Sequence, residues 1–486
     1  MNEDVYKLKP ERLWYYFGEI LKIPRPSKKE EKIAQYLVNF GESQGLPTVR
    51  DTVGNILISK PATKGMENRK TTVLQSHIDM VCEKNADVDH DFDNDPIEAY
   101  VEDGWVKARG TTLGADDGIG IATQLALLES TDIPHGPLEC LFTVDEETGL
   151  TGAFGLNESL LRGEILLNLD SEDDGELFIG CAGGKDTLIK MPYKKINPPA
   201  EHLTMKIEIS GLKGGHSGDD IQKGRGNANK LLNRILWEAS INFDLQLSVF
   251  NGGNLRNAIA REAYAIVMIP EAFKDQFIRY IDQYEKGIKY EYRVTEPELK
   301  LTLEEKDSAN FIMDKKSKDN LLNSIYACPH GVIAWSQEIE NFVETSTNLA
   351  SVKTLEDHIS ITTSQRSSVE SAKEDIANMV ASVFRLSGST VEHTDGYPGW
   401  SPNPNSAIVD ITVESYKKLF NEDPIVRAVH AGLECGLIGD KYPGMDMISY
   451  GPTIRGAHSP DEKLEIFTVQ KFWDLTLDVL KSIPKK

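Results

Sequence analysis

A short junction between a predicted strand and a predicted helix constrains the fold more than any other stretch of the chain. Trp105–Ala108 is typical of a strand and Ile119–Leu128 of a helix, and Asp116 and Asp117 stand between them, flanked by glycines. Strand-to-helix turns of open α/β sheets direct side chains into the crevice where these folds bind ligands. On its own such an acidic pair is most often an N-cap, which accepts hydrogen bonds from the first N–H groups of the helix. The junction therefore predicts an α/β fold and leaves the role of the two aspartates open.

Three further strand-like runs end in the same kinds of side chain. One leads into His77 and Asp79, the next into Glu146 and Glu147, and the third ends at Asp170. Adjacent acids at the end of an apolar strand are costly unless a cation compensates them. Histidine nitrogen and carboxylate oxygen are ligands that zinc takes in proteins. Together with the aspartate junction, these strand ends predict a metal site.

A histidine near the far end of the sequence offers a second nitrogen ligand. His458 follows the apolar run Met447–Tyr450 and lies in a segment rich in glycine and proline. Two zinc ions that share one carboxylate can hold an attacking hydroxide between them. The expected ligand sets are His77, Asp116 and Asp170 for one zinc ion, and Asp116, Glu147 and His458 for the other.

The neighbouring residues receive supporting roles. Glu146 and Glu147 cannot both bind one ion through so short a loop, so we expect Glu146 to stay free as the general base. Asp79 shares a strand face with His77 and is expected to orient its ring. Because oxygen-rich sites accept several metals, cobalt or manganese in place of zinc stays open.

The length of 486 residues exceeds a single usual core and predicts more than one domain. Composition changes near Pro198, and an α/β pattern returns over the last part of the chain, with helix-like runs at 405–419 and 424–437. We predict the α/β class: a discontinuous catalytic domain, a mixed sheet flanked by helices, from residues 1–198 and 391–486. Residues 199–390 would form an inserted α+β domain.

Composition and missing motifs exclude several classes of protein. The net charge of −23 argues against a nucleic-acid partner, and no run reaches the ~18 apolar residues of a membrane helix. Five scattered cysteines and an N-terminus without a signal-peptide pattern predict a cytoplasmic protein. The acidic run Asp87–Glu98 has an EF-hand-like spacing, but Phe92 stands where that loop needs glycine, so we expect a solvated loop rather than a calcium site. The glycine-rich segment Gly214–Gly218 lacks the paired lysine and serine of a P-loop.

The motifs as a set resemble a known family. They are His77-x-Asp79, Gly114-Ala115-Asp116-Asp117, Asp145-Glu146-Glu147, Asn168-Leu169-Asp170, Gly215-His216-Ser217 and His458. This set is similar to the di-zinc exopeptidases typified by carboxypeptidase G and aminoacylase. The segments Ile23–Lys28, Thr111–Asp116 and Gly456–Glu462 are closer still to the aminoacyl-histidine dipeptidase (Xaa-His dipeptidase) branch.

The resemblance implies a metal-dependent dipeptidase that cleaves small Xaa-His dipeptides of the carnosine kind. It also implies that the inserted domain is a lid, that His216 polarises the oxyanion, and that Asn257 and Arg366 bind substrate. A surface arginine is the alternative for Arg366. The Asp116–Asp117 peptide would be cis. His216 would act within one chain or across a homodimer, and this point stays open.

Two rival functions stay open as well. One is an N-acyl amino acid deacylase or tripeptidase on the same scaffold. The other is a non-catalytic metal-binding protein, against which the presence of Glu146 argues.

Overall fold

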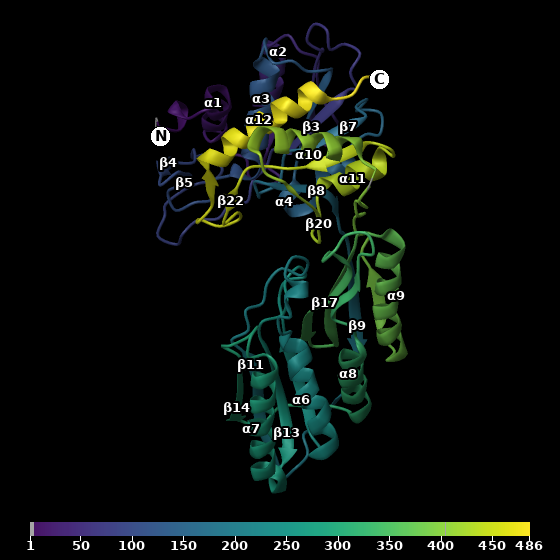
Figure 1. Ribbon diagram of the computed structural model, residues 1–486. Helices are drawn as coiled ribbons and strands as arrows, with labels where there is room; N and C mark the ends of the chain where they lie inside the picture. Colours follow the sequence, from purple (N-terminus) through teal and green to yellow (C-terminus); the bar gives the residue numbers. More distant parts are fainter. Residues whose placement is uncertain (1–3, 404) are drawn as a thin grey trace. The chain divides into compact units, whose positions relative to one another are not determined.

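The computed structural model describes residues 4–403 and 405–486, which form two compact units (Figure 1). Unit 1 comprises the chain up to Gly180, Trp400–Ala428 and Leu433–Lys486. Unit 2 comprises Cys181–Gly399 and Val429–Gly432, and so is inserted into unit 1. The first division between the units falls after Gly180, before strand β9 (Gly183–Pro192), whereas the sequence analysis places its domain boundary near Pro198.

Unit 1 contains a mixed sheet of eight strands among the described residues. Their order across the sheet is β1 (Thr48–Arg50), β2 (Ile56–Lys60), β6 (Leu138–Thr143), β3 (Thr72–His77), β7 (Ile165–Asn168), β21 (Asp446–Ser449), β8 (Glu176–Cys181) and β20 (Ile425–Val429). The central strands β6, β3, β7 and β21 are parallel, and β1, β2 and β8 pair antiparallel. The carboxyl ends of the four parallel strands therefore meet at one edge of the sheet.

Helices flank this sheet and bury their apolar sides against it. The long ones are α1 (Glu11–Ile20), α2 (Glu31–Ser43), α3 (Ala115–Glu129), α10 (Ala407–Phe420), α11 (Glu434–Lys441) and α12 (Ile466–Ser482), and the short ones α4 (Glu146–Gly149) and α5 (Thr151–Gly155). Helix α3 is buried along nearly its whole length, as expected of a helix that is apolar on all sides. The core contains Trp14, Phe17 and Phe472 together with strand residues such as Leu74 and Leu167.

A smaller sheet connects the aspartate junction to the C-terminal part of unit 1. It contains β22 (Ile454–Arg455), β23 (Lys463–Glu465), β5 (Trp105–Ala108) and β4 (Ala99–Glu102), in that order. Because β23 pairs antiparallel with β5, the loop that ends in β23 lies beside the segment that follows β5.

Unit 2 is an antiparallel sheet with helices. Its strands follow the order β14 (Lys300–Lys306), β11 (His202–Ser210), β13 (Ala263–Pro270), β12 (Gln246–Gly252), β17 (Val343–Thr354), β18 (His358–Ser367), β9 (Gly183–Pro192) and β19 (Thr390–His393), with β16 (Gly331–Trp335) beside β17. The helices are α6 (Ala228–Asn242), α7 (Lys274–Glu291), α8 (Lys315–Ala327) and α9 (Glu370–Leu386), and β10 (Lys195–Ile196) pairs with β15 (Ile312–Met313). These helices share a hydrophobic core with the sheet. The predicted fold class, a discontinuous α/β unit with an inserted α+β unit, is confirmed.

One predicted helix is wrong. The run 424–437 contains strand β20 and only the beginning of helix α11, at Glu434. The physical reason is that Ile425–Val429 is rich in β-branched residues and pairs with strand β8. The helical spacing of apolar residues does not reveal such a pairing. The described residues contain no helix that combines the length and the apolar character needed to cross a membrane.

Candidate active site

The acidic and histidine side chains predicted at the strand ends gather at the carboxyl edge of the unit 1 sheet. His77 ends β3, and its Nε2 lies 2.9 Å from Asp116 Oδ1 and 3.3 Å from Asp170 Oδ1. His458 Nε2 lies 3.1 Å from Asp116 Oδ2 and 2.9 Å from Glu147 Oε2. The carboxylate of Asp116 thus has one oxygen toward each histidine.

Three groups of three side chains around His77 and Asp116 could each hold a metal ion. They are His77, Asp116 and Asp170; Asp116, Glu147 and His458; and His77, Glu146 and Glu147. In each group the possible ligand atoms lie within 4.8 Å of one another. The first two groups are the ligand sets that the sequence analysis expects, and the third adds Glu146. The Asp116–Asp117 peptide bond is cis, as the resemblance implies.

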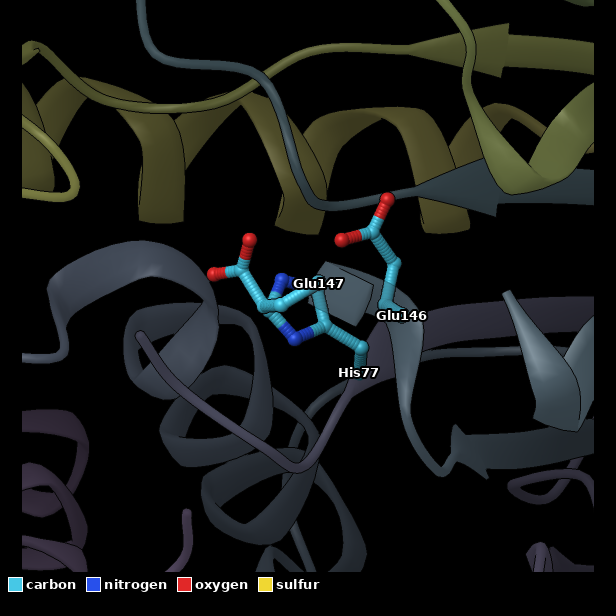
Figure 2. Close-up of side chains that lie close together, drawn as sticks. All are labelled: His77, Glu146 and Glu147. Atoms are coloured by element: carbon cyan, nitrogen blue, oxygen red, sulfur yellow. The ribbon is translucent and has the colours of Figure 1, made fainter. Parts of the chain in front are cut away.

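Glu146 and Glu147 begin the short helix α4, directly after β6. Figure 2 shows the carboxylates of Glu146 and Glu147 on either side of the His77 ring in this view. Asp79 binds the start of α4: its Oδ1 accepts a hydrogen bond from Glu146 N at 3.0 Å, and its Oδ2 accepts one from Ser27 Oγ at 2.7 Å. Asp79 Oδ1 also lies 3.3 Å from His77 Nδ1, which suits a residue that orients the ring.

The electrostatics of the cluster favour bound cations. Burial raises the pKa of Glu146 well above its ordinary value, and it raises the pKa of Asp170 to about 6. Burial also acts to raise the pKa of Asp116, but hydrogen bonds from the rings of His458 and His77 outweigh it and hold that pKa well below the usual range. Buried carboxylates so close together repel one another unless positive charge separates them.

The donor set passes a direct test of fit for divalent metals. Glu147 Oε1 is buried and has no hydrogen-bond partner among the residues that the structure describes. Such an orphaned carboxylate oxygen is costly, and a metal ion would satisfy it. Imidazole nitrogen and carboxylate oxygen are ligands that zinc accepts.

A buried polar layer lies directly behind the cluster and was missed by the sequence analysis. Glu434, at the start of α11, is fully buried and accepts hydrogen bonds from Gln75 Nε2 and Thr143 Oγ1, both at 2.6 Å. Gln75 Oε1 accepts one from Asn168 Nδ2 at 2.6 Å, and Asn168 Oδ1 accepts one from Ser449 Oγ at 2.5 Å. We call these five residues the polar layer; it crosses the strands β6, β3, β7 and β21.

The sequence contains one indication of this buried polar layer. Gln75 stands two residues before His77 and directly follows Val73 and Leu74, and Asn168 stands two before Asp170 and directly follows the apolar run 165–167. Residues two apart in a strand share a face. The sequence therefore indicates that the amides of Gln75 and Asn168 lie behind the site residues, but it does not indicate that Glu434 is the partner of Gln75.

The three remaining predicted site residues lie together in unit 2. Arg366, only 7% exposed, donates from Nη2 to His216 Nε2 at 3.4 Å, from Nη1 to Tyr397 Oη at 3.0 Å, and from Nε to Ser217 Oγ at 3.3 Å. The alternative of a surface arginine is therefore wrong. Asn257 is exposed, and its backbone carbonyl oxygen accepts a hydrogen bond from Ser217 N at 2.8 Å.

A cavity of about 810 Å³ in unit 2 has both His216 and Asn257 in its lining. Lys206, Arg261 and Glu262 also line it.

In the acidic run Asp87–Glu98 of unit 1, Asp93 is exposed and pairs with Lys29 Nζ at 2.7 Å, as expected of a solvated loop.

Comparison with known proteins agrees with this geometry. Residues 73–481 match the model of peptidase family M20/M25/M40. The chain is 45% identical over 483 residues to the cytosol non-specific dipeptidase of Escherichia coli, covering 99% of this chain and 100% of that protein.

Solved structures give the same result. The aminoacylhistidine dipeptidase of Vibrio alginolyticus superposes with a TM-score of 0.91 at 45% identity, covering 99% of this chain and 98% of the other. An aminopeptidase of Bacillus cereus, at 17% identity and a TM-score of 0.58 over 98% of this chain and 99% of the other, shares the fold. These matches confirm the resemblance that the motifs indicate. The chain therefore belongs to peptidase family M20/M25/M40 and is a metallopeptidase.

Proposed function

We propose that this chain is a metal-dependent dipeptidase that uses two zinc ions and accepts Xaa-His dipeptides of the carnosine kind. The observation that carries the proposal is the position of Asp116, whose two carboxylate oxygens lie 2.9 Å from His77 Nε2 and 3.1 Å from His458 Nε2. A carboxylate placed between two histidine-centred groups is suited to bridging two cations.

The proposed ligands divide between the two ions. His77 and Asp170 would hold one, Glu147 and His458 the other, and Asp116 would hold both. Bound divalent cations would act as Lewis acids toward the peptide carbonyl and would lower the pKa of a water molecule. Cobalt or manganese is the alternative to zinc, because the set contains more oxygen than nitrogen ligands.

Glu146 is the proposed general base. It would take the proton of the attacking water and pass it to the leaving amine. Its backbone N–H is held by Asp79 Oδ1, so the carboxylate that fixes Glu146 is the same one that lies 3.3 Å from His77 Nδ1. Asp79 would thus align the base with the metal pair.

Unit 2 is the proposed lid. His216 would polarise the carbonyl oxygen, and Asn257 would contact the substrate. Arg366 would bind the free C-terminal carboxylate of the substrate, because a guanidinium suits that group. Three of its five N–H donors are bonded within unit 2, which leaves two for the substrate. This recognition would limit the enzyme to short substrates.

The relatives differ in the breadth of substrate that their names state. The Escherichia coli protein is called non-specific and the Vibrio protein an aminoacylhistidine dipeptidase. We propose that this chain accepts Xaa-His dipeptides among other dipeptides. We also propose that it acts in the cytosol, because the name of the Escherichia coli protein places that relative there. A small dipeptide is the proposed partner, with no nucleic acid or membrane.

A substrate panel tests this function. The protein is stripped of metal and assayed on carnosine, Ala-Ala, a tripeptide and an N-acetyl amino acid, before and after zinc, cobalt or manganese is restored. We expect metal-dependent cleavage of the dipeptides alone. Preferred cleavage of the tripeptide or of the N-acetyl amino acid would favour the tripeptidase or deacylase alternative, and metal uptake without hydrolysis would favour a non-catalytic metal-binding protein.

A mixing experiment with two variants tests whether a homodimer forms and which chain supplies His216. His216→Ala and Glu146→Gln variants are each expected to be inactive. Activity regained when the two are mixed would place His216 across a homodimer, since a mixed dimer then has one complete site.

A further inference from the structure

One buried carboxylate outside the proposed ligand sets holds the segment that carries Asp116. Glu462 is 3% exposed, and its Oε2 accepts hydrogen bonds from the N–H groups of Leu113 and Gly114 at 2.7 and 2.9 Å. Its Oε1 accepts hydrogen bonds from the N–H groups of Ala115 and Asp116 at 2.8 and 3.3 Å. A single side chain therefore satisfies four consecutive N–H groups at the start of α3.

The first turn of helix α3 has no side-chain cap at its N-cap position; one turn later, Asp117 Oδ1 accepts a hydrogen bond from Gly120 N at 3.1 Å. The first N–H groups of a helix lack partners inside it, and that end of the helix carries a partial positive charge. The N-cap position is Gly114, with φ of 71°, and a Cβ there would lie 2.6 Å from Arg25 Nη2. No capping side chain fits at that position, and the negative charge comes instead from Glu462, 348 residues later in the chain.

Arg25 holds the same segment through its carbonyl groups. This arginine is 2% exposed and donates from Nη2 to Gly114 O, and from Nη1 to Ile78 O and Asp79 O. Gly114 is therefore held by both of its backbone groups, the N–H by Glu462 and the C=O by Arg25. The guanidinium also ties this segment to the residues that follow His77.

Glu462 belongs to the loop that carries His458. The N–H of Glu462 donates to Ser459 O at 3.0 Å, and Ser459 Oγ donates to Gly456 O at 2.7 Å, which closes the loop around His458. His458 has φ of 62°, a conformation that residues with a side chain rarely adopt. Glu462 thus joins the loop of one proposed ligand to the segment of another.

We propose that Glu462 is a positioning residue for the metal pair: it fixes the backbone at Asp116 and so keeps that carboxylate between His77 and His458. A side chain that served only to cap α3 would need no place in the loop of His458. This inference rests on the proposed function, because it assumes that metals bind at Asp116.

Replacing Glu462 with Gln tests the inference. Glutamine keeps the shape of the side chain, but its amide NH2 group takes the place of one acceptor oxygen of the carboxylate. The backbone N–H groups that bonded to that oxygen therefore lose their acceptor. We expect zinc affinity, measured in competition with a chromogenic chelator, to fall by about 10- to 100-fold. Amide hydrogen exchange at 113–116 in the metal-free protein should become faster, and excess zinc should restore dipeptide turnover.

Two further variants complete the design. Asp461→Asn removes the same charge from the adjacent exposed position and should leave zinc affinity and exchange unchanged. Glu462→Asp keeps the charge but shortens its reach, and its zinc affinity should lie between those of the wild type and Glu462→Gln.

Unchanged zinc affinity and unchanged exchange in Glu462→Gln would overturn the inference. Failure of both Glu462 variants to fold would also overturn it, since Glu462 would then determine the fold rather than the metal pair. Wild-type protein that binds no metal would instead count against the proposed function, so the two failures are distinguishable.

Discussion

Glu146 and Glu147 are neighbours in the sequence but have different surroundings. Glu147 Oε2 lies 2.9 Å from His458 Nε2, and the Glu146 carboxylate lies on the other side of the His77 ring in the view of Figure 2. Glu146→Gln keeps the shape of the side chain but removes its ability to accept a proton. We expect kcat on a dipeptide to fall by about 10²- to 10⁴-fold or more, with metal content unchanged. Steady-state kinetics and elemental analysis of the same samples check this.

Glu147→Gln is the matched control, since it makes the same chemical change one residue away. This variant should lose metal as well as activity, because Glu147 is a proposed ligand. Near-normal turnover of Glu146→Gln, or equal loss of metal in both variants, would refute the division of roles.

At the level of single residues, the sequence reveals the groups whose position along the chain is itself informative. His77 and Asp170 follow directly from where apolar strands end. Glu462 carries no such signal, because its four N–H partners lie about 350 positions away in the sequence and are backbone groups of any residue type. Arg25 is hidden for the same reason, since it bonds three carbonyl oxygens.

At the level of elements, the four parallel strands of unit 1 explain why the site could be predicted at all. Parallel strands end at one edge of a sheet, so acidic residues after β3, β6 and β7 must come close together. The run 424–437 was predicted wrongly because β20 is defined by pairing with β8, and pairing partners are not visible in local spacing.

The polar layer allows a test at this scale. Gln75→Leu removes the amide that donates to Glu434 and accepts from Asn168, and it leaves both partners buried with unmet hydrogen bonds. We expect the free energy of unfolding of the metal-free protein to fall by about 3 kcal/mol. Urea denaturation measures this, with Gln44→Leu at an exposed position as the control. A change below about 0.5 kcal/mol, typical of a surface substitution, would contradict the role given to the layer.

At the scale of the whole molecule, 76 acidic side chains against 53 lysines and arginines give a net charge of −23. Some of that acidity is concentrated in the buried cluster around Asp116, where burial raises the pKa of Glu146 and of Asp170. Without metal the fold must either protonate these groups or hold like charges together. Bound divalent cations remove that conflict, so metal binding should also stabilise the folded chain.

Ligands that bind only the folded state add RT ln(1 + [L]/Kd) to its stability, about 2.7 kcal/mol when free metal is at 100 times Kd. We therefore expect the urea midpoint to fall when zinc is removed with a chelator and to return when excess zinc is added. The Glu462→Gln variant should show a smaller difference at the same zinc concentration, because its affinity is lower. Coinciding curves for the metal-free and zinc-loaded wild type would mean that these side chains hold no metal tightly, and the shared carboxylate of Asp116 would then need another explanation.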